Sequence, residues 1–384
     1  MKYSVLLPTR NGGRFLTNCI ESVLHQDNDD FELVISDNAN TDETPTIIDS
    51  FAKDRRLRAI HHKRPLSVVD NWTEAYKASR GEYILMLGDD DLLLPGYFRC
   101  MDAVIRRHVE PSCIIYNGFS FVHPGSITGE ARSFWSKYHF RFGPEFQEEA
   151  VLEETLRYSI VRDMFRFQQR IPLNMQTTLF RRDAVSLFDG EIFLPPFPDH
   201  YLLNALLLTA DKWVYHPGRL VVVGVSPKSF GHYHYSQDAQ KGLSYLGVNT
   251  NFPDALPGNE LVNGMYLWLM KLKANYPEKL EGVEIDRASY VRRQVYTWLR
   301  DFFYGAISLT VFSRRFSLMR REDWISCLTA VFERENWQRL RQMIGSLWQS
   351  KASALWRGLE PLDGIGNIHE FAWWLQQSGQ IEAP

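Results

Sequence analysis

The chain has 384 residues, of which 45% are hydrophobic and 23% charged, an ordinary composition for a globular protein. This composition excludes a disordered, collagen-like or disulfide-scaffold protein, and the length allows two or three domains. With 43 basic and 46 acidic side chains the formal net charge is −3, so no global positive field indicates nucleic acid as a partner. The four cysteines lie too far apart for a paired zinc or redox motif, and we expect reduced, structural thiols.

The N-terminal 117 residues alternate short apolar runs with helical patterns, which predicts βαβ units and a mostly parallel sheet. The first helix is expected to pack on this sheet through an apolar stripe from Phe15 to Leu24. A second helix is expected to begin at Thr44, a hydroxyl residue followed by proline. The expected strands are residues 4–7, 31–36, 57–61, 83–87 and 113–116.

A soft domain boundary is expected near residue 258. Residues 1–258 are predicted to form an α/β unit in which an insertion, residues 118–172, separates the halves 1–117 and 173–258. Residues 259–384 have helical periodicity and hold eight of the eleven tryptophans, which predicts a helical domain. Within the α/β unit, further helices are expected at residues 148–167 and 199–210, and further strands at 174–181, 213–216 and 220–225.

The N-terminus leads from Met1 and Lys2 directly into the first expected strand, without the basic head and apolar stretch of a signal peptide. The most apolar stretch of the second half, residues 302–312, is shorter than the roughly 20 residues of a membrane-spanning helix. We therefore expect a cytoplasmic protein without a spanning helix.

The sharpest chemical signal is the run Gly88-Asp89-Asp90-Asp91, directly after the expected strand at residues 83–87. Adjacent carboxylates raise one another's pKa, and a divalent cation is the usual means of neutralising them. Oxygen ligands without thiols favour Mg²⁺ or Mn²⁺. In α/β sheets, ligands gather at the carboxyl ends of the strands, where this triplet is expected. The alternative interpretation is a solvated acidic turn that caps the next helix.

Two other expected strands end in polar residues that would lie at the same edge. Asp37 follows the strand at residues 31–36, and the first strand ends in Pro8-Thr9-Arg10-Asn11-Gly12-Gly13. Arg10 and the small residues of this loop suit contact with a nucleotide. The loop has neither the GxGxxG nor the GxxxxGK[ST] pattern, which argues against a dinucleotide site or a P-loop.

Taken in chain order, these segments resemble the family 2 glycosyltransferases of the GT-A fold. The resemblance implies a Rossmann-like α/β fold with a mainly helical C-terminal extension. It further implies metal-dependent, inverting transfer of a sugar from a nucleotide-sugar, with UDP as the expected nucleotide, to a glycan or lipid-linked acceptor in surface polysaccharide or glycoconjugate synthesis. The segments that carry it are Val5-Leu-Leu-Pro-Thr-Arg-Asn11, Ser22-Val-Leu-His-Gln26, Phe31-Glu-Leu-Val-Ile-Ser-Asp37-Asn-Ala-Asn-Thr-Asp42, Asn71-Trp72 and Gly81-Glu-Tyr-Ile-Leu-Met-Leu-Gly-Asp-Asp-Asp91.

The same resemblance implies the site residues by position. The family's Asp-x-Asp-Asp pattern would have its first aspartate at position 88, where this chain has Gly88, so the triplet is shifted relative to the pattern. Asp90 falls on the metal-binding position whether the pattern is aligned from its left end or from its right end. The implied nucleotide-sugar residues are Pro8, Thr9, Arg10, Asn11, Asp37, Asn71, Asp89 and Asp90. The implied ligands of Mn²⁺ or Mg²⁺ are Asp90 and Asp91, with His232 or His234 as a further ligand from the segment after the last expected strand.

Asp199, at the start of the helix expected at residues 199–210, falls where the family has its general base. Such a carboxylate removes the proton of the acceptor hydroxyl during attack on the anomeric carbon. The preceding residue, often acidic in the family, is Pro198 in this chain. The alternative interpretation is that Asp199 only caps its helix.

The expected C-terminal helices carry a local positive charge. From Arg287 to Arg357 there are 13 basic and 5 acidic residues, interleaved with aromatic side chains. This mixture suits peripheral contact with an anionic membrane, an oligomer interface or a helical bundle with a solvated basic face. The bundle is favoured because a set of apolar residues follows the spacing of a core. This set is Val291, Val295, Trp298, Leu299 and Phe302.

Two other functions remain open from the sequence. A sugar nucleotidyltransferase also uses an α/β nucleotide domain with acidic metal ligands, but it typically has a glycine-rich loop with a lysine after the first strand, unlike residues 8–13. A non-catalytic nucleotide- or glycan-binding subunit is favoured by Gly88 and Pro198, which stand where the family has acidic residues.

Overall fold

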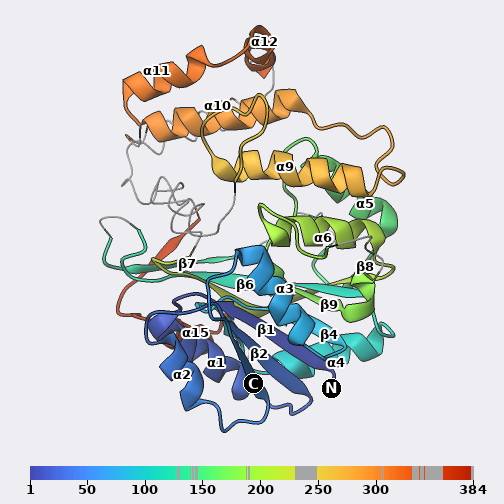
Figure 1. Ribbon diagram of the computed structural model, residues 1–384, viewed down its shortest axis with the longest axis vertical. Coiled ribbons are helices and arrows are strands. Elements are labelled where there is room, and N and C mark those ends of the chain that lie inside the picture. The colour runs from blue at the N-terminus through green and yellow to red at the C-terminus, as the bar shows by residue number, and fades with distance from the viewer. Residues whose placement is uncertain are drawn as a thin grey trace.

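The computed structural model describes residues 1–127, 130–138, 140, 142, 146–186, 188, 191–229, 249–303, 305, 307–330, 337, 341 and 358–381. Strands and helices alternate in the first part of the chain, and helices predominate from residue 260 onward (Figure 1). His232 and His234, two of the predicted metal ligands, lie outside the described residues.

Four parallel strands, in the order β3-β2-β1-β4, form one half of the sheet. Strands β1, β2 and β4 are nearly continuous buried apolar runs, because helices cover both faces of a parallel sheet. The register places Pro8 beside Ser36 and Thr9 beside Asp37, so the predicted nucleotide-binding residues end neighbouring strands. The four strands are β1 (Tyr3–Thr9), β2 (Phe31–Asp37), β3 (Leu57–His61) and β4 (Tyr83–Met86).

The other half of the sheet is mixed, so the mostly parallel arrangement holds only for β1 to β4. Strand β9 lies antiparallel between β4 and β6, and β7 returns beside β6 without the crossover helix that a parallel pair requires. The two strands expected at residues 213–216 and 220–225 are one strand, β10, whose pairing with β6 shifts register on both sides of Arg219. These strands are β5 (Leu92–Leu93), β6 (Cys113–Val122), β7 (Ser133–Lys137), β8 (Ala150–Leu152), β9 (Thr178–Arg181), β10 (Trp213–Val225) and β11 (Glu360–Leu362).

Helices cover the two faces of the sheet, and the sheet separates the two largest core clusters. Because side chains alternate along a strand, Val5 and Leu7 pack with α1, α2 and α4, whereas Leu6 packs with α3, α5 and α6. These helices are α1 (Leu16–Leu24), α2 (Thr44–Ser50), α3 (Val68–Ala78), α4 (Tyr97–Arg107), α5 (Glu154–Met164) and α6 (Pro198–Thr209), with short 3₁₀ turns η1 (Gly13–Phe15), η2 (Met175–Thr177) and η3 (Arg182–Val185).

The C-terminal helices stack outward from α6, with α9 above it, α10 above α9, and α11 and α12 outermost (Figure 1). Val291, Val295 and Trp298 of α10 are buried, as their spacing in the sequence predicts for a bundle. No described helix is both long and apolar enough to cross a membrane. The helices are α9 (Glu260–Asn275), α10 (Arg287–Phe303), α11 (Leu309–Ser317) and α12 (Arg321–Ala330).

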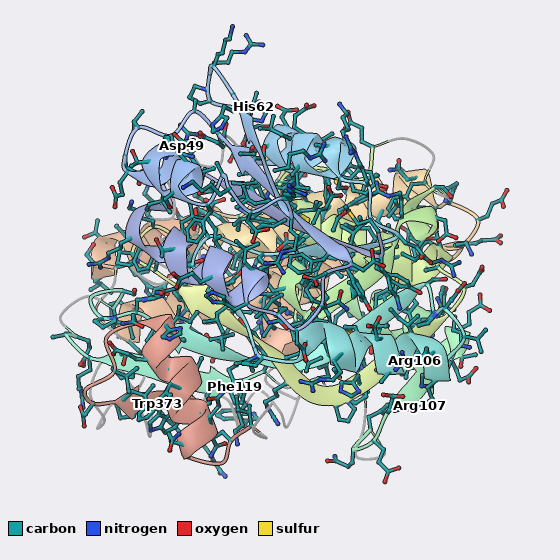
Figure 2. All side chains as sticks on the ribbon, turned by 90° about the horizontal axis from the view of Figure 1, so that it is seen from below. Asp49, His62, Arg106, Arg107, Phe119 and Trp373 are labelled. Atoms are coloured by element: carbon teal, nitrogen blue, oxygen red, sulfur yellow. The ribbon has the colours of Figure 1, made fainter. Side chains whose placement is uncertain are left out.

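The last described segment returns to the sheet. Strand β11 pairs with β7, and α15 (Ile368–Gln377) packs on the neighbouring strands through Phe371, whose ring stacks on Phe121 at 4.9 Å between centroids. Figure 2 shows α15 beside the strand that carries Phe119, with Trp373 on its outer side. Residues 358–381 therefore complete the core of the α/β part of the molecule rather than the helical stack.

Candidate functional site

The carboxylate triplet, Asp89 to Asp91, lies in a tight turn at the carboxyl end of β4. The Asp91 amide donates to the Gly88 carbonyl at 3.2 Å, and the Gly88 amide donates to Asp91 Oδ2 at 2.5 Å. The turn leads into β5, which pairs with β10. The triplet therefore sits at the strand edge where the sequence predicts it.

The last residue of β1 is bonded directly to the triplet. The Thr9 hydroxyl donates to Asp89 Oδ2 at 2.6 Å, which brings together two of the predicted nucleotide-sugar residues. Pro8 and Arg10 flank Thr9 on the same segment. A Cβ on Gly12 would lie 2.6 Å from Asp89 Oδ2 and 2.7 Å from Thr9 Oγ1, so only glycine fits beside this hydrogen bond.

The end of β10 binds the other two carboxylates. The Ser226 amide donates to Asp90 Oδ2 at 3.0 Å. Asp91 Oδ1 accepts from the Gly224 amide at 2.9 Å, and Asp91 Oδ2 accepts from Gln176 Nε2 at 2.8 Å. Protein donors thus occupy both oxygens of Asp91, whereas within the described residues Asp90 accepts through Oδ2. Asp90 is the better placed of the two for a cation, and the metal role of Asp91 stays a prediction.

The electrostatics of the triplet favour a bound cation. Burial raises the pKa of all three carboxyls, that of Asp91 to about 7 and that of Asp90 well above its usual value, and repulsion from Asp91 and Asp89 raises the pKa of Asp90 further. Among the described residues no three acidic, histidine or cysteine side chains form a complete metal site. Magnesium, however, is commonly held by one or two carboxylates together with water and substrate phosphates, and the oxygens of Asp89 and Asp90 fit that donor set.

Sequence reasoning missed three of the residues that bind the triplet: Gln176, Gly224 and Ser226. Only Gly224 carried a signal, because a glycine inside a strand pattern often marks a close approach of another segment. A Cβ at this position would lie 1.9 Å from the Asp90 carbonyl oxygen, so the backbone of β10 rests directly against the triplet. Ser226 acts through its backbone amide, which no sequence pattern distinguishes.

Replacing Gly224 by alanine is expected to destabilise the protein by about 1–3 kcal/mol, because overpacking forces the backbone apart. The melting temperature should fall, and donor binding should weaken as the triplet moves. The matched control is Gly366→Ala, since a Cβ on Gly366 would meet only Glu370 Oε2 at an ordinary 3.5 Å. If Gly224→Ala had the same melting temperature as this control and bound nucleotide normally, the tight packing of β10 on the triplet would be refuted.

Asp37, at the end of β2, is held between two polar neighbours. Its Oδ1 accepts from Asn40 Nδ2 at 2.6 Å, and its Oδ2 lies 2.8 Å from His61 Nδ1 at the end of β3. Asn71 is buried below, where its Oδ1 accepts from the Ser36 hydroxyl at 2.7 Å. Asp37 therefore lies in an ordered polar edge beside Thr9, while Asn71 supports the strand end from inside. Their contact with a nucleotide stays a prediction.

A lysine that the sequence did not single out lies over the same loop. Lys228, which follows β10, donates through Nζ to the Asn11 carbonyl at 2.7 Å and forms an ion pair with Asp42 at 3.2 Å. Asn11 in turn accepts through Oδ1 from the Thr41 amide at 2.9 Å. The half-exposed ammonium is thus positioned at the loop where an anionic ligand of the site would bind.

Asp199 lies in the first turn of α6, but it does not cap the helix. The helix begins at Pro198, its N-cap is Phe197, and no side chain makes a capping bond, so the capping alternative is wrong. Asp199 Oδ1 accepts from the adjacent His200 amide at 3.0 Å, and burial raises the pKa of this carboxyl. No hydrogen bond or ion pair joins Asp199 to the triplet in the described part of the chain.

Both ends of α6 are fixed by other segments. At the C-terminal end, the buried guanidinium of Arg157 from α5 donates to the carbonyls of Leu207, at 3.0 Å, and Ala210, at 2.5 Å. At the N-terminal end, α9 passes so close that a Cβ on Gly264 would lie 2.2 Å from a ring carbon of Phe197. The predicted insertion and the helical region therefore both determine where Asp199 lies.

A cavity of about 730 Å³ lies at the opposite edge of the sheet. Gly81 and Arg182, two of the residues that line it, precede β4 and follow β9, whereas the triplet follows β4. This cavity is therefore separate from the triplet and from the loop after β1.

Residues 4–157 match the family described as glycosyl transferase family 2. The resemblance predicted from the sequence is thereby confirmed over that segment. The predicted GT-A class of α/β fold, with a mainly helical C-terminal region, is confirmed by the arrangement of the strands and helices. The matched segment contains β1 to β4 and the triplet.

Curated relatives match shorter stretches of the chain. A PGL/p-HBAD biosynthesis glycosyltransferase of Mycobacterium tuberculosis is 33% identical over 115 residues, which are 30% of this chain and 45% of that protein. The glycosyltransferase GlyG of Streptococcus pneumoniae is 30% identical over 91 residues, which are 23% of this chain and 30% of that protein. This chain thus spans less than half of either relative's length. Among solved structures, S. aureus TarS 1–349 in complex with UDP-GlcNAc aligns with a TM-score of 0.48 and 15% identity, over 99% of this chain and 92% of that one.

Proposed function

We propose that this chain, with its family 2 glycosyltransferase segment at residues 4–157, is a metal-dependent, inverting glycosyltransferase. Its proposed donor is a nucleotide-sugar of the UDP type, and its proposed acceptor is a glycan or lipid-linked molecule of glycoconjugate synthesis. The observation that carries the proposal is the triplet at the end of β4, with Asp90 and Asp91 buried and Asp89 bonded to Thr9 at the end of β1. This arrangement places the acidic triplet beside the polar strand ends that are proposed to contact the nucleotide.

The donor half of the proposed reaction uses the residues around the triplet. Asp90, with Asp89 beside it, would hold Mn²⁺ or Mg²⁺, and the ion would supply positive charge that stabilises the departing nucleoside diphosphate. Lys228 adds a second positive group over the loop after β1. Thr9 and Asp37 are the proposed contacts to the base and the ribose, because they end neighbouring strands at this edge.

The acceptor half of the proposed reaction belongs to Asp199. Its carboxylate would take the proton of the acceptor hydroxyl while that oxygen forms a bond to the anomeric carbon and the bond from this carbon to the phosphate oxygen breaks. One displacement of this kind inverts the anomeric configuration. Burial raises the pKa of Asp199, which makes its carboxylate a stronger base than an exposed one.

The test is thermal unfolding of the full chain with nucleoside diphosphates and nucleotide-sugars, each with and without Mn²⁺. A ligand that binds only the folded state stabilises it by about 2.7 kcal/mol at a hundredfold excess over its Kd. We expect an increase in melting temperature on the order of 5 °C for one nucleotide class, and only with the metal. If no nucleotide raised the melting temperature under either condition, the proposal would fail. Formation of nucleotide-sugar from a sugar phosphate would identify a nucleotidyltransferase instead.

A further inference from the structure

The outermost helix of the stack, α12, has its polar side inward and its apolar side outward. Asp323 is 1% exposed and binds the guanidinium of Arg287 on α10, with N–O distances of 3.2 and 3.3 Å. It also accepts from the Arg320 amide at 3.1 Å. This buried ion pair fixes the rotation of α12 about its axis.

The rotation leaves a complete apolar stripe exposed on α12. Trp324, Ile325 and Leu328 are 44%, 53% and 65% exposed and recur at the spacing of one helix face, opposite Asp323. Arg321 lies on the same stripe and is exposed. In a soluble monomer an amphipathic helix normally buries such a stripe, so this orientation indicates an interaction surface.

The neighbouring helix α11 continues the exposed stripe. None of its residues is fully buried, and Val311, Arg314 and Leu318 share one exposed face of the helix and its C-terminal end. Its aromatic residues instead point into the stack, where Phe316 packs on Trp298 with ring centroids 5.3 Å apart. We define the α11–α12 surface as these exposed residues of both helices: Val311, Arg314, Leu318, Arg321, Trp324, Ile325 and Leu328.

The charges on this surface favour an anionic lipid membrane over a second copy of the chain as its binding partner. Arg315 and Arg320 are paired with Asp301 and Asp254, whereas Arg314 and Arg321 form no ion pair with any described residue. A second copy of the chain docked face to face would bring these free guanidinium groups together in an apolar interface. An anionic lipid surface offers each of them an opposite charge, worth about 1 kcal/mol per basic residue.

We propose that the α11–α12 surface binds the surface of an anionic phospholipid membrane. Leu318, Ile325 and Leu328 would insert among the lipids, Trp324 would lie at headgroup level, and the two arginines would contact phosphates. This inference goes beyond the proposed function and stands without it.

The test is co-sedimentation of the full chain with vesicles of phosphatidylcholine, alone or mixed with phosphatidylglycerol. We expect binding to the mixed vesicles that weakens as salt screens the charges. Ile325→Ser with Leu328→Ser should lower this binding at least tenfold, since each exposed side chain loses on the order of 1 kcal/mol of apolar transfer. Arg314→Gln with Arg321→Gln should lower it about thirtyfold on mixed vesicles only, since two basic residues contribute about 1 kcal/mol each.

The matched control is Trp373→Ser, because Trp373 is 61% exposed on α15 (Figure 2). Helix α15 lies beside the sheet, at the other end of the molecule from α11 and α12 (Figure 1). Unchanged melting temperatures would establish that the variants fold. The proposal would be overturned if the wild-type protein did not bind anionic vesicles. It would also be overturned if the variants bound them as tightly as the wild type. A wild-type dimer in solution that Ile325→Ser with Leu328→Ser converted to monomer would overturn it as well, because a second copy would then cover the surface. Donor binding is measured separately, so failure here leaves the proposed function untouched.

Discussion

Asp90→Asn is expected to lower the rate of sugar transfer about a thousandfold or more. Within the described residues Asp90 accepts through Oδ2, whereas both oxygens of Asp91 are engaged, so losing the charge of Asp90 removes a carboxylate well placed to hold the metal. A metal contributes several kcal/mol to stabilising the leaving group, and each 1.36 kcal/mol changes the rate tenfold. The measurement is product formation at saturating donor and Mn²⁺.

The same variant should unfold no more easily than wild type in the absence of metal. An asparagine at this position would keep the size of the side chain while removing repulsion between buried carboxylates. The metal-dependent increase in melting temperature with nucleotide should disappear. Asp49→Asn is the matched control, because Asp49 is exposed on α2 (Figure 2). Transfer by Asp90→Asn within tenfold of the wild-type rate would remove Asp90 from the metal site.

Asp199→Asn is expected to lower kcat by about 10²–10⁴-fold, the usual contribution of a general base. An amide cannot take the acceptor proton, but it can accept the His200 amide hydrogen bond that holds the carboxylate. Donor binding should therefore be unchanged, and the metal-dependent shift in melting temperature should equal that of wild type. The measurement is transfer to acceptor under conditions where the donor site is saturated.

A fitting control for this variant is Asp211→Asn, because Asp211 is an exposed carboxylate just beyond the other end of α6. Its side chain can be neutralised without disturbing the carbonyls that Arg157 binds. Normal kcat in Asp199→Asn would exclude Asp199 as the base. A lost donor-induced shift would instead point to a misplaced α6.

The donor half of the fold could be predicted from the sequence because its signals are local. Strands β1, β2 and β4 are continuous apolar runs of ordinary length, and parallel strands must carry their carboxyl ends to one edge. Thr9 and Asp37, which end β1 and β2, and the triplet, which follows β4, therefore had to lie near one another. The hydrogen bond from Thr9 to Asp89 is the direct consequence.

The surroundings of the triplet could not be predicted, because they come from segments distant in the chain. Gln176 and the backbone of β10 bind Asp91 across separations of 85 and 133 residues. Backbone amides carry no residue-specific pattern, and β10 was expected as two short strands. Only the assembled sheet distinguishes Asp90, whose Oδ2 alone accepts a bond from the described residues, from Asp91, both of whose oxygens accept.

In the C-terminal region, too, some features follow from the sequence alone and others only from the tertiary structure. The sequence by itself determined that α10 packs through Val291, Val295 and Trp298, because a periodic apolar stripe must be buried wherever the helix lies. It equally determined the strand-end chemistry of the donor half. Only the tertiary structure decided which way α12 faces, because the buried pair of Asp323 with Arg287 joins residues from two helices. An ion pair between distant residues of this kind determines how a helix is rotated about its axis, which the apolar periodicity of the helix's own sequence does not decide.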